Sequence, residues 1–486
     1  MKYQSTRNHA LTASPAAAVL QGIAPDGGLY MPEAIPVLDW QSLMKEDTLT
    51  MSARILSALL PDYEDMPALV RRGYAGKFET EDLTPLVSVG DRYVLELFRG
   101  PTSAFKDVAL SLLPQLISQA RDMEGIEDEM LILTATSGDT GKAALEGFHD
   151  VPGTKIIVFY PYGGVSAVQQ AQMVTQEGAN VKVCAVRGNF DDTQTGVKQI
   201  FASCDQEDLP GLRLSSANSI NIGRLVPQVV YYVYAYAKLL ANGEIEKNEK
   251  VNVVVPTGNF GNILAAYFAK QMGVPFGKLI CASNDNKVLY DFFQTGTYDK
   301  NREFILTTSP SMDILVSSNL ERLLYLSCGR DAAKTKAMME QLSTNGKYEI
   351  TADMKEFMKD FCAGYADMEE NAKEIRKVFD DTGYLIDTHT GVAAAVYEQY
   401  KAKTGDTTKT VIASTASPYK FSRSVMEAVL GKKEDADEFA LIDEMERISG
   451  VKIPQAIEEI RDAKILHNRQ CKPEEMEETV KQTFSK

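Results

Sequence analysis

The stretch of sequence that decides the fold runs from residue 130 to residue 148 and reads MLILTATSGDTGKAALEGF. Residues 130–135 form an apolar run typical of a buried strand. Residues 136–141 form a turn of small polar side chains, and residues 142–148 follow with a helical pattern. Strand, turn and helix in this order are the unit of α/β proteins with a mainly parallel sheet, so the stretch predicts an α/β fold.

The same succession recurs along the chain. Four further apolar runs lead into turns of small polar residues, Gly or Pro, at residues 155–160, 181–186, 251–255 and 410–413. Ligands of parallel sheets bind at the carboxyl ends of the strands, where such turns gather. These turns are therefore the first places in which to look for a functional site.

The chain divides into three predicted parts. Residues 1–85 are predicted to form a mainly helical N-terminal domain, because Leu43, Ile55 and Leu59 recur at helical spacing. Residues 86–430 are predicted to form an α/β region in which a smaller, mobile subdomain occupies about 105–210. Within this region, residues 331–380 are charged and predicted to be helical, as is a C-terminal extension at 431–486.

Composition narrows the class of protein. Among 486 residues, 51 Lys and Arg face 67 Asp and Glu, a formal net charge of −16, which argues against nucleic acid or an anionic membrane as partner. With 44% hydrophobic and 24% charged residues, the chain resembles soluble globular proteins, and it lacks an apolar run of about 18 residues. Its six cysteines are scattered, which predicts reduced thiols in a cytoplasmic protein, and its four histidines show no metal-ligand spacing.

The segment FRGPTSAFKD, residues 98–107, places Lys106 on the first turn of a predicted helix. The amino end of a helix carries a partial positive charge, so an ammonium group gains nothing there. This position favours a functional lysine whose neutral amine is needed, as for Schiff-base formation. The alternative is an ordinary surface lysine at a helix entry.

Two glycine-containing turns are candidate anion sites. Residues 136–141, TSGDTG, offer amides and hydroxyls at a helix start, but Thr136 and Ala143 exclude the Walker pattern. Residues 256–262, PTGNFGN, follow a buried strand, and Gly258 and Gly261 allow the backbone to close on a ligand. The second turn is not a dinucleotide fingerprint, so a single phosphate group is the better expectation. An ordinary α/β turn remains the alternative for each.

A third polar segment, SSANSINIGR at residues 215–224, surrounds Arg224 with small donors. The guanidinium fork suits a carboxylate or a phosphate, with Asn218, Ser219 and Asn221 as supporting donors. A helix-capping stretch would explain the same residues. Two further hydroxyl-rich turns, DTHTG at 387–391 and STASP at 414–418, are weak signals when each is taken alone.

Taken in this order, these segments resemble the threonine synthase family of pyridoxal-phosphate enzymes, in its longer bacterial and fungal type. The similarity also includes YQSTR at 3–7 and QGIAPDGGLYMPE at 21–33, and the segment GPTSAFKD at 100–107 is the most specific match. The resemblance implies a fold-type II enzyme with two parallel-sheet domains, a helical N-terminal domain and pyridoxal 5′-phosphate as cofactor. It further implies that the enzyme converts O-phospho-L-homoserine and water to L-threonine and phosphate.

The resemblance also implies roles for individual residues. Lys106 would hold the cofactor as a Schiff base, and Thr415 would meet its pyridine nitrogen. The cofactor phosphate would be bound by the backbone of Gly258, Asn259, Phe260, Gly261 and Asn262. Ser137, Asp139 and Thr140 would lie near the substrate carboxylate and the phenolic side of the cofactor, and Asn218, Ser219 and Arg224 would hold the substrate phosphate.

One position departs from the family pattern. Where the family usually reads Thr-Ala-His-Pro, this chain has Ser417 in place of the histidine, so that position is given no chemical role. His389 does fit the family pattern, although a loop histidine with satisfied hydrogen bonds would also explain it. The same cofactor could instead serve a phospholyase or a dehydratase-like lyase that releases a keto acid. A non-catalytic phosphate-binding module is the alternative from another class.

Overall fold

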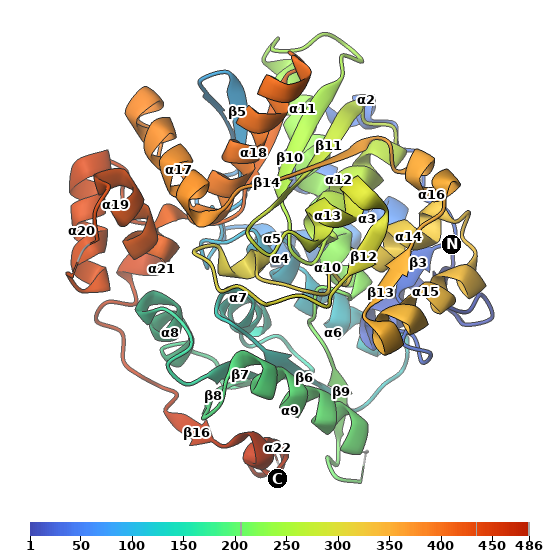
Figure 1. Ribbon diagram of the computed structural model, residues 1–486. Helices are drawn as coiled ribbons and strands as arrows, with labels where there is room; N and C mark the ends of the chain where they lie inside the picture. Colours follow the sequence, from blue (N-terminus) through green and yellow to red (C-terminus); the bar gives the residue numbers. More distant parts are fainter. Residues whose placement is uncertain (205–206, 434, 485–486) are drawn as a thin grey trace.

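The computed structural model describes residues 1–204, 207–433 and 435–484, and two sheets organise these residues (Figure 1). The larger sheet has the strand order β14-β11-β10-β15-β5-β4, and the smaller has the order β16-β8-β7-β6-β9. Figure 1 shows the smaller sheet below the larger one, with the N-terminal elements beside the larger sheet. The predicted α/β fold with two mainly parallel sheets is confirmed.

The larger sheet is built around a fully buried valine-rich strand. Its strands are β4 (Leu86–Val89), β5 (Arg92–Glu96), β10 (Val251–Pro256), β11 (Phe276–Ser283), β14 (Phe361–Tyr365) and β15 (Thr410–Ser414). Every residue of β10 is buried, because helices cover both faces of a parallel sheet. The edge strand β4 is the exception to parallel pairing, since it runs antiparallel to β5.

The smaller sheet is parallel throughout. Its strands are β6 (Glu129–Ala135), β7 (Thr154–Pro161), β8 (Val181–Val186), β9 (Leu212–Ser215) and β16 (Arg469–Cys471). Apolar side chains from one face of this sheet form a separate core with the end of the chain, including Ile157, Phe159 and Val480.

The N-terminal elements combine helices with a small antiparallel sheet. They are β1 (Tyr3–Ser5), β2 (Thr12–Ala13), α1 (Pro15–Gln21), β3 (Tyr30–Pro32), α2 (Trp40–Leu43), α3 (Thr48–Leu59) and α4 (Met66–Tyr74). Their apolar faces belong to the same core as the larger sheet.

Helices cover the two sheets and connect their strands. Those of the first half are α5 (Lys106–Leu110), α6 (Leu113–Met123), α7 (Asp139–Phe148), α8 (Ala167–Val174), α9 (Phe190–Ser203), α10 (Ile222–Leu225) and α11 (Pro227–Ala241). Those around β11 to β14 are α12 (Gly261–Gln271), α13 (Val288–Thr295), η1 (Pro310–Met312), α14 (Leu320–Ser327), α15 (Ala332–Asn345) and α16 (Ala352–Phe357), with the two-stranded antiparallel sheet of β12 (Thr297–Asp299) and β13 (Lys347–Glu349). The last are α17 (Met368–Thr382), α18 (Thr388–Thr404), η2 (Pro418–Phe421), α19 (Ser422–Leu430), α20 (Glu438–Ser449), α21 (Gln455–Glu458), η3 (Pro473–Glu475) and α22 (Met476–Phe484).

Two segments predicted to be helical contain strands. Residues 331–380 include β13, which pairs with β12, and β14, which pairs with β11; the C-terminal extension includes β16, which pairs with β8. All three strands are short, and each forms by pairing with a distant part of the chain rather than from local pattern.

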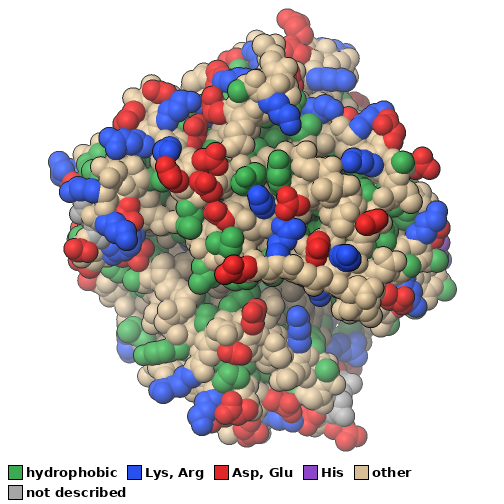
Figure 2. All heavy atoms as spheres, in the orientation of Figure 1, with side chains coloured by type: hydrophobic (Ala, Val, Ile, Leu, Met, Phe, Trp, Pro, Cys, Tyr) green, Lys and Arg blue, Asp and Glu red, His purple; other side chains and the backbone are tan. Residues whose placement is uncertain are grey.

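Surface charge and helix length agree with the composition. Acidic and basic side chains are interspersed over the face shown in Figure 2. Within the described residues, no helix combines the length and the apolar character that crossing a bilayer requires.

Helix α5, which begins at Lys106, packs closely against α7. A Cβ atom at Gly147 would lie 1.9 Å from the backbone oxygen of Leu110 in α5, so only glycine permits this contact. The contact joins the carboxyl-terminal ends of the two helices that begin at Lys106 and Asp139.

We expect Gly147→Ala to lower the free energy of unfolding by about 1–3 kcal/mol, because overpacking forces backbone to shift. Urea denaturation measures this. Gly196→Ala in α9 is the matched control: its Cβ would meet the flexible end of Met476, so the change there should stay below about 1 kcal/mol. Equal losses in both variants would contradict the close packing of α5 on α7.

Candidate active site

Lys106 is buried at the first position of α5, with 8% of its surface exposed. Its Nζ donates a hydrogen bond to Ser311 Oγ at 3.1 Å and lies 3.6 Å from Asp139 Oδ2. The alternative of a surface lysine at a helix entry therefore does not hold. The amine instead faces polar groups from η1 and α7.

The turn before Lys106 is fixed on both sides. Thr102 donates its amide to Asp107 Oδ2 at 2.9 Å and its hydroxyl to the other carboxylate oxygen. The amide of Phe105 donates to the carbonyl oxygen of Thr415 at 2.8 Å, and that of Ser417 donates to the carbonyl oxygen of Ser103 at 3.0 Å. Thr415 thus lies directly beside the lysine-bearing turn, as its proposed role requires.

Asp139 is a buried carboxylate shared by several donors. Lys420 Nζ lies 2.9 Å from its Oδ1, which also accepts from Gln169 Nε2 at 3.1 Å. Although burial opposes ionisation, the charges of Lys420 and Lys106 hold the pKa of this carboxyl well below its usual range. Asp139 is therefore ionised and committed to protein partners.

The electrostatic surroundings of Lys106 favour its neutral amine. Burial lowers the pKa of its ammonium group; Asp139 opposes this, and the positive charges of Lys420 and Arg224 lower it further. A buried lysine with a lowered pKa is suited to act as a nucleophile or as a base.

The turn at 256–262 ends at the amino terminus of α12 and has the geometry of an anion cradle. Phe260 adopts a left-handed conformation with φ of 65°, and no side chain caps the helix that begins at Gly261, so its first amides are open. A Cβ atom at Gly258 would lie 2.6 Å from the backbone oxygen of Ser311, whereas one at Gly261 would find ordinary contacts from 3.5 Å. Gly258 is therefore required by its contact with the Ser311 backbone, and the close approach of both glycines to a ligand stays a prediction.

The side chains of this cradle differ in exposure. Asn259 is exposed, while Phe260 and Asn262 are buried. Asn262 Oδ1 accepts hydrogen bonds from the hydroxyls of Tyr231 and Tyr232, and among the described residues its Nδ2 has no partner. A buried amide donor without a partner points to a ligand that the cradle would hold.

Arg224 is buried on α10, with 3% of its surface exposed. One nitrogen, Nη1, donates to the carbonyl oxygen of Ala217 at 2.6 Å, while Nε has no partner within the described part of the chain. Burial lowers the pKa of this guanidinium to about 10, which leaves it charged at neutral pH. An arginine with an unsatisfied buried donor is suited to bind an anion.

The remaining predicted residues lie on exposed turns. Asn218 is exposed and Ser219 half-buried at the turn before α10, where the Ser219 hydroxyl donates to Asn218 Oδ1 at 3.2 Å. Ser137 is exposed and Thr140 half-buried at the start of α7, on either side of buried Asp139. These side chains are accessible to a substrate, whereas Asp139 is not.

Sequence reasoning missed several residues of this site. Asn319 joins the two anion turns: its amide donates to the carbonyl oxygen of Asn259 at 3.0 Å, and its Nδ2 donates to that of Ser219 at 3.1 Å. Lys420, with 0% exposure, lies three residues after Ser417. Its spacing carried no signal, because burial of a single lysine cannot be read from its neighbours.

Ser311 was also missed, and it explains His389. His389 Nδ1 donates to Asp387 Oδ2 at 2.7 Å, and Nε2 accepts the amide of Ser311 at 3.1 Å. Asp387 thus orients the ring of His389, and the ring holds the backbone of Ser311, whose hydroxyl accepts a hydrogen bond from Lys106. Asp313 holds the same segment by accepting from Asn284 Nδ2 at 2.7 Å. Ser417 caps η2 by accepting the amide of Tyr419, which agrees with assigning it no chemistry.

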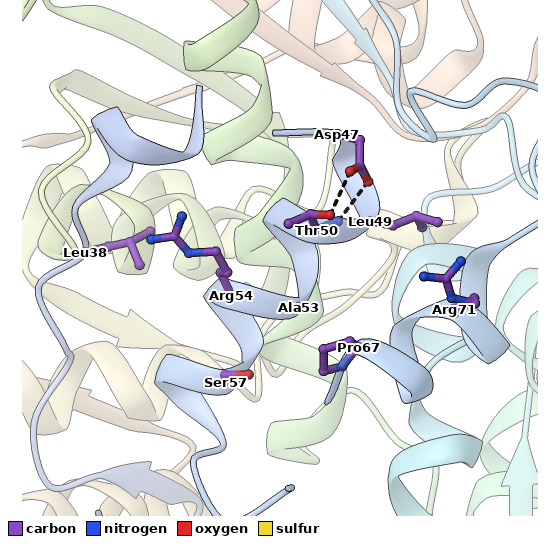
Figure 3. A pocket seen from close by; sticks show the side chains of 9 residues that line it. All are labelled: Leu38, Asp47, Leu49, Thr50, Ala53, Arg54, Ser57, Pro67 and Arg71. Atoms are coloured by element: carbon purple, nitrogen blue, oxygen red, sulfur yellow. Dashed lines mark hydrogen bonds between the residues drawn. The ribbon is translucent and has the colours of Figure 1, made fainter. Parts of the chain in front are cut away.

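A cavity of about 690 Å³ lies elsewhere, between α3, α4 and Leu38 (Figure 3). Figure 3 shows Arg54 and Arg71 at its rim, with Asp47 turned back to cap Thr50. None of the described site residues lines this cavity, so its size does not make it the active site.

Comparison with known proteins identifies the family. The family model described as "Pyridoxal-phosphate dependent enzyme" matches residues 81–416, "Threonine synthase N terminus" matches 2–89, and "Threonine synthase, C-terminal" matches 390–467. Threonine synthase of Saccharomyces cerevisiae is 36% identical over 96% of both chains. The chain belongs to the threonine synthase family.

Solved structures of threonine synthases have the same fold as this chain. A PLP-bound threonine synthase from Brucella melitensis is 35% identical, with a TM-score of 0.89 over 100% of both chains. Human threonine synthase-like 1 is 39% identical over 85% of this chain, and this chain spans 57% of that protein's length. The resemblance to the family and the fold-type II architecture are thereby confirmed.

The residues present fit pyridoxal phosphate, the cofactor of the threonine synthase family. A phosphate would meet the open amides of α12 and the unpaired Asn262 Nδ2. An aldehyde needs a neutral amine, and Lys106 is buried where that form is favoured. Both requirements are met by independent elements around one site.

We expect Gly258→Ala to weaken cofactor binding about tenfold or more, because its Cβ would displace the Ser311 backbone, and overpacking costs about 1–3 kcal/mol. Titration of the cofactor-free protein with pyridoxal phosphate, followed by absorbance, measures this. Asn259→Ala is the control in the same loop, since it keeps the backbone amide and should bind the cofactor as the unchanged protein does. Unchanged affinity in a folded Gly258→Ala protein would contradict the cradle.

Proposed function

We propose that the protein is a threonine synthase, which converts O-phospho-L-homoserine and water to L-threonine and phosphate. One observation carries the proposal: the site combines a buried amine, Lys106, with two separate anion sites. One of these is the open start of α12, and the other is Arg224. A cofactor phosphate needs one such site, and a phosphorylated substrate needs a second. Family membership supports the same assignment.

Bound pyridoxal phosphate supplies an electron sink for carbanion chemistry on an amino acid. Lys106 would hold the cofactor by its aldehyde, and its free amine would accept and return protons at the α and β carbons of the substrate. Burial lowers the pKa of Lys106, which eases the loss of its proton. Thr415 would offer the pyridine nitrogen a hydroxyl and not a carboxylate, which would make the electron sink milder.

The substrate is held at its two charged ends. Ser137 and Thr140, accessible at the start of α7, bind the carboxylate. Arg224, with Asn218 and Ser219, binds the phosphate and stabilises its charge as the bond to the γ carbon breaks. Water then adds at the β carbon to give threonine.

We further propose that residues 105–210 move as a subdomain between open and closed states. The division into two sheets supports this, since β6, β7 and β8 belong to the smaller sheet, which has its own strand order. A cytoplasmic location is also proposed, and the six free cysteines support it.

The alternative is a lyase on the same cofactor that releases a keto acid. Arg224 favours a phosphorylated substrate but does not force addition of water. Incubation with O-phospho-L-homoserine, with phosphate, threonine and 2-oxobutanoate measured together, decides between them. Threonine equal to phosphate supports the synthase, and 2-oxobutanoate in its place supports the lyase.

We expect Lys106→Ala to lose turnover completely, because no other amine takes its place at the cofactor. Borohydride reduction of the unchanged protein should attach the cofactor to one peptide, which mass spectrometry should assign to Lys106. Recovery of the label on Lys142 or Lys420 would contradict the assignment.

We expect Arg224→Ala to lower kcat/KM for O-phospho-L-homoserine about ten- to a hundred-fold, since a hydrogen bond to a charged group contributes about 1.5–3 kcal/mol. Steady-state assays measure this, and the absorbance of bound cofactor should not change. Arg213→Ala, at an exposed arginine of β9, is the matched control and should keep full activity. Loss of cofactor from Arg224→Ala, or equal slowing with an unphosphorylated amino acid, would contradict its role at the substrate phosphate.

A further inference from the structure

A second lysine is buried beside the first. Lys420 has 0% exposure; its Nζ donates to the carbonyl oxygen of Thr102 at 2.9 Å and lies 2.9 Å from Asp139 Oδ1. Burying an ammonium group costs several kcal/mol unless it is paired. The mechanism proposed for Lys106 gives the charge of Lys420 no role.

The two oxygens of Asp139 serve different lysines. Oδ1 is taken by Lys420 and by Gln169 Nε2. Oδ2 lies 3.6 Å from Lys106 Nζ and 3.5 Å from the Ser311 hydroxyl that donates to it. The ion pair of Asp139 with Lys420 is therefore the shorter one. The attraction between the carboxylate and Lys106 is weaker, because that distance is longer.

We propose that Lys420 is a positioning residue that neutralises Asp139 and thereby keeps Lys106 as the neutral amine. Without Lys420, Asp139 would be a full counter-ion for Lys106 and would hold it as an ammonium group. The inference rests on the role proposed for Lys106, because only a reactive amine needs this protection.

The other groups facing Lys106 do not replace Lys420. Arg224 on α10 adds a positive charge but has no contact with Asp139 among the described residues. Ser311 on η1 is neutral, and His389 on α18 reaches only its amide. Asp107, the next residue of α5, turns its carboxylate to Thr102. Lys420 is thus the cation that binds the carboxylate beside Lys106.

The geometry keeps Lys106 in place when the charge of Lys420 is removed. The segment before Lys420 is attached to the lysine-bearing turn by backbone bonds from Phe105 to Thr415 and from Ser417 to Ser103. The backbone bridge between Ala104 and Ala416 adds to these. A neutral side chain at position 420 therefore changes the charge more than the shape.

The test measures Lys106 in the cofactor-free protein, without relying on catalysis. Brief acetylation with acetic anhydride across a range of pH, with the Lys106 peptide quantified by mass spectrometry, gives the pKa of its amine. Exposed Lys403 serves as the internal standard. In the unchanged protein, Lys106 should titrate below the ordinary lysine value.

Lys420→Gln keeps a donor for Thr102 and Asp139 but removes the charge, and Lys420→Met removes both. An opposite charge at this range shifts a pKa by about one unit or more, so the reactivity of Lys106 at pH 8 should fall about tenfold or more in either variant. Lys420→Arg keeps the charge and should restore the reactivity. These three variants separate charge from packing.

An unchanged Lys106 titration in folded Lys420→Gln or Lys420→Met would overturn the proposal and leave Lys420 a purely structural tie. An ordinary lysine pKa in the unchanged protein would overturn it without any variant, even if both variants failed to fold. Because acetylation needs no substrate, these results stand apart from the product assay. A failed assay with a shifted Lys106 would count against the proposed function alone.

Discussion

Asp139 is a charged carboxylate that is almost entirely excluded from water, and this constraint organises the molecule around it. Removing such a group from water costs several kcal/mol unless cations and donors surround it. Its partners come from other parts of the chain: the amine of Lys106 lies 3.6 Å away at the start of α5, and the ammonium group of Lys420 lies 2.9 Å away in η2 after β15. The carboxyl ends of β6 and β15 must therefore meet, which brings the two sheets together at one polar site.

Several polar side chains of the site lie on an irregular segment, residues 307–319, that contacts other parts of the chain. Residues 307–319 cross the site without regular structure except η1, and hydrogen bonds to Asp313, His389 and Asn259 fix them. This segment presents Ser311 to Lys106 and joins both anion turns through Asn319. A rigid arrangement of donors needs no rearrangement when charge develops on a substrate, which is how such sites stabilise transition states.

Much of the fold could be predicted because its signals are local. The apolar run and polar turn at 130–141 contain all that is needed to indicate a strand followed by a ligand site. Lys106, Gly258 and Arg224 were found in the same way, since each lies in a short motif of distinctive chemistry. Their order along the chain, rather than any one motif, gave the family.

What could not be predicted depends on contacts between distant residues. β14 reads FCAGY between charged segments, and only its pairing with β11 makes it a strand. Lys420 looks like any lysine in sequence, because its burial follows from the meeting of η2 with the turn at Thr102. Ser311 lies in no recognisable motif, and hydrogen bonds with three other segments place it at the site. It accepts from Lys106 and donates to His389 and Asp139.

The strand β16 has a consequence for the order in which the chain folds. It adds to the edge of the smaller sheet beside β8, and Cys471 is its last residue. During synthesis, the edge of β8 stays unpaired until all the strands of the larger sheet have been made. An unpaired edge strand is a template for association with other chains. The edge of the smaller sheet is covered only after residue 471 has left the ribosome, so until then its solubility depends on chaperones or on rapid synthesis.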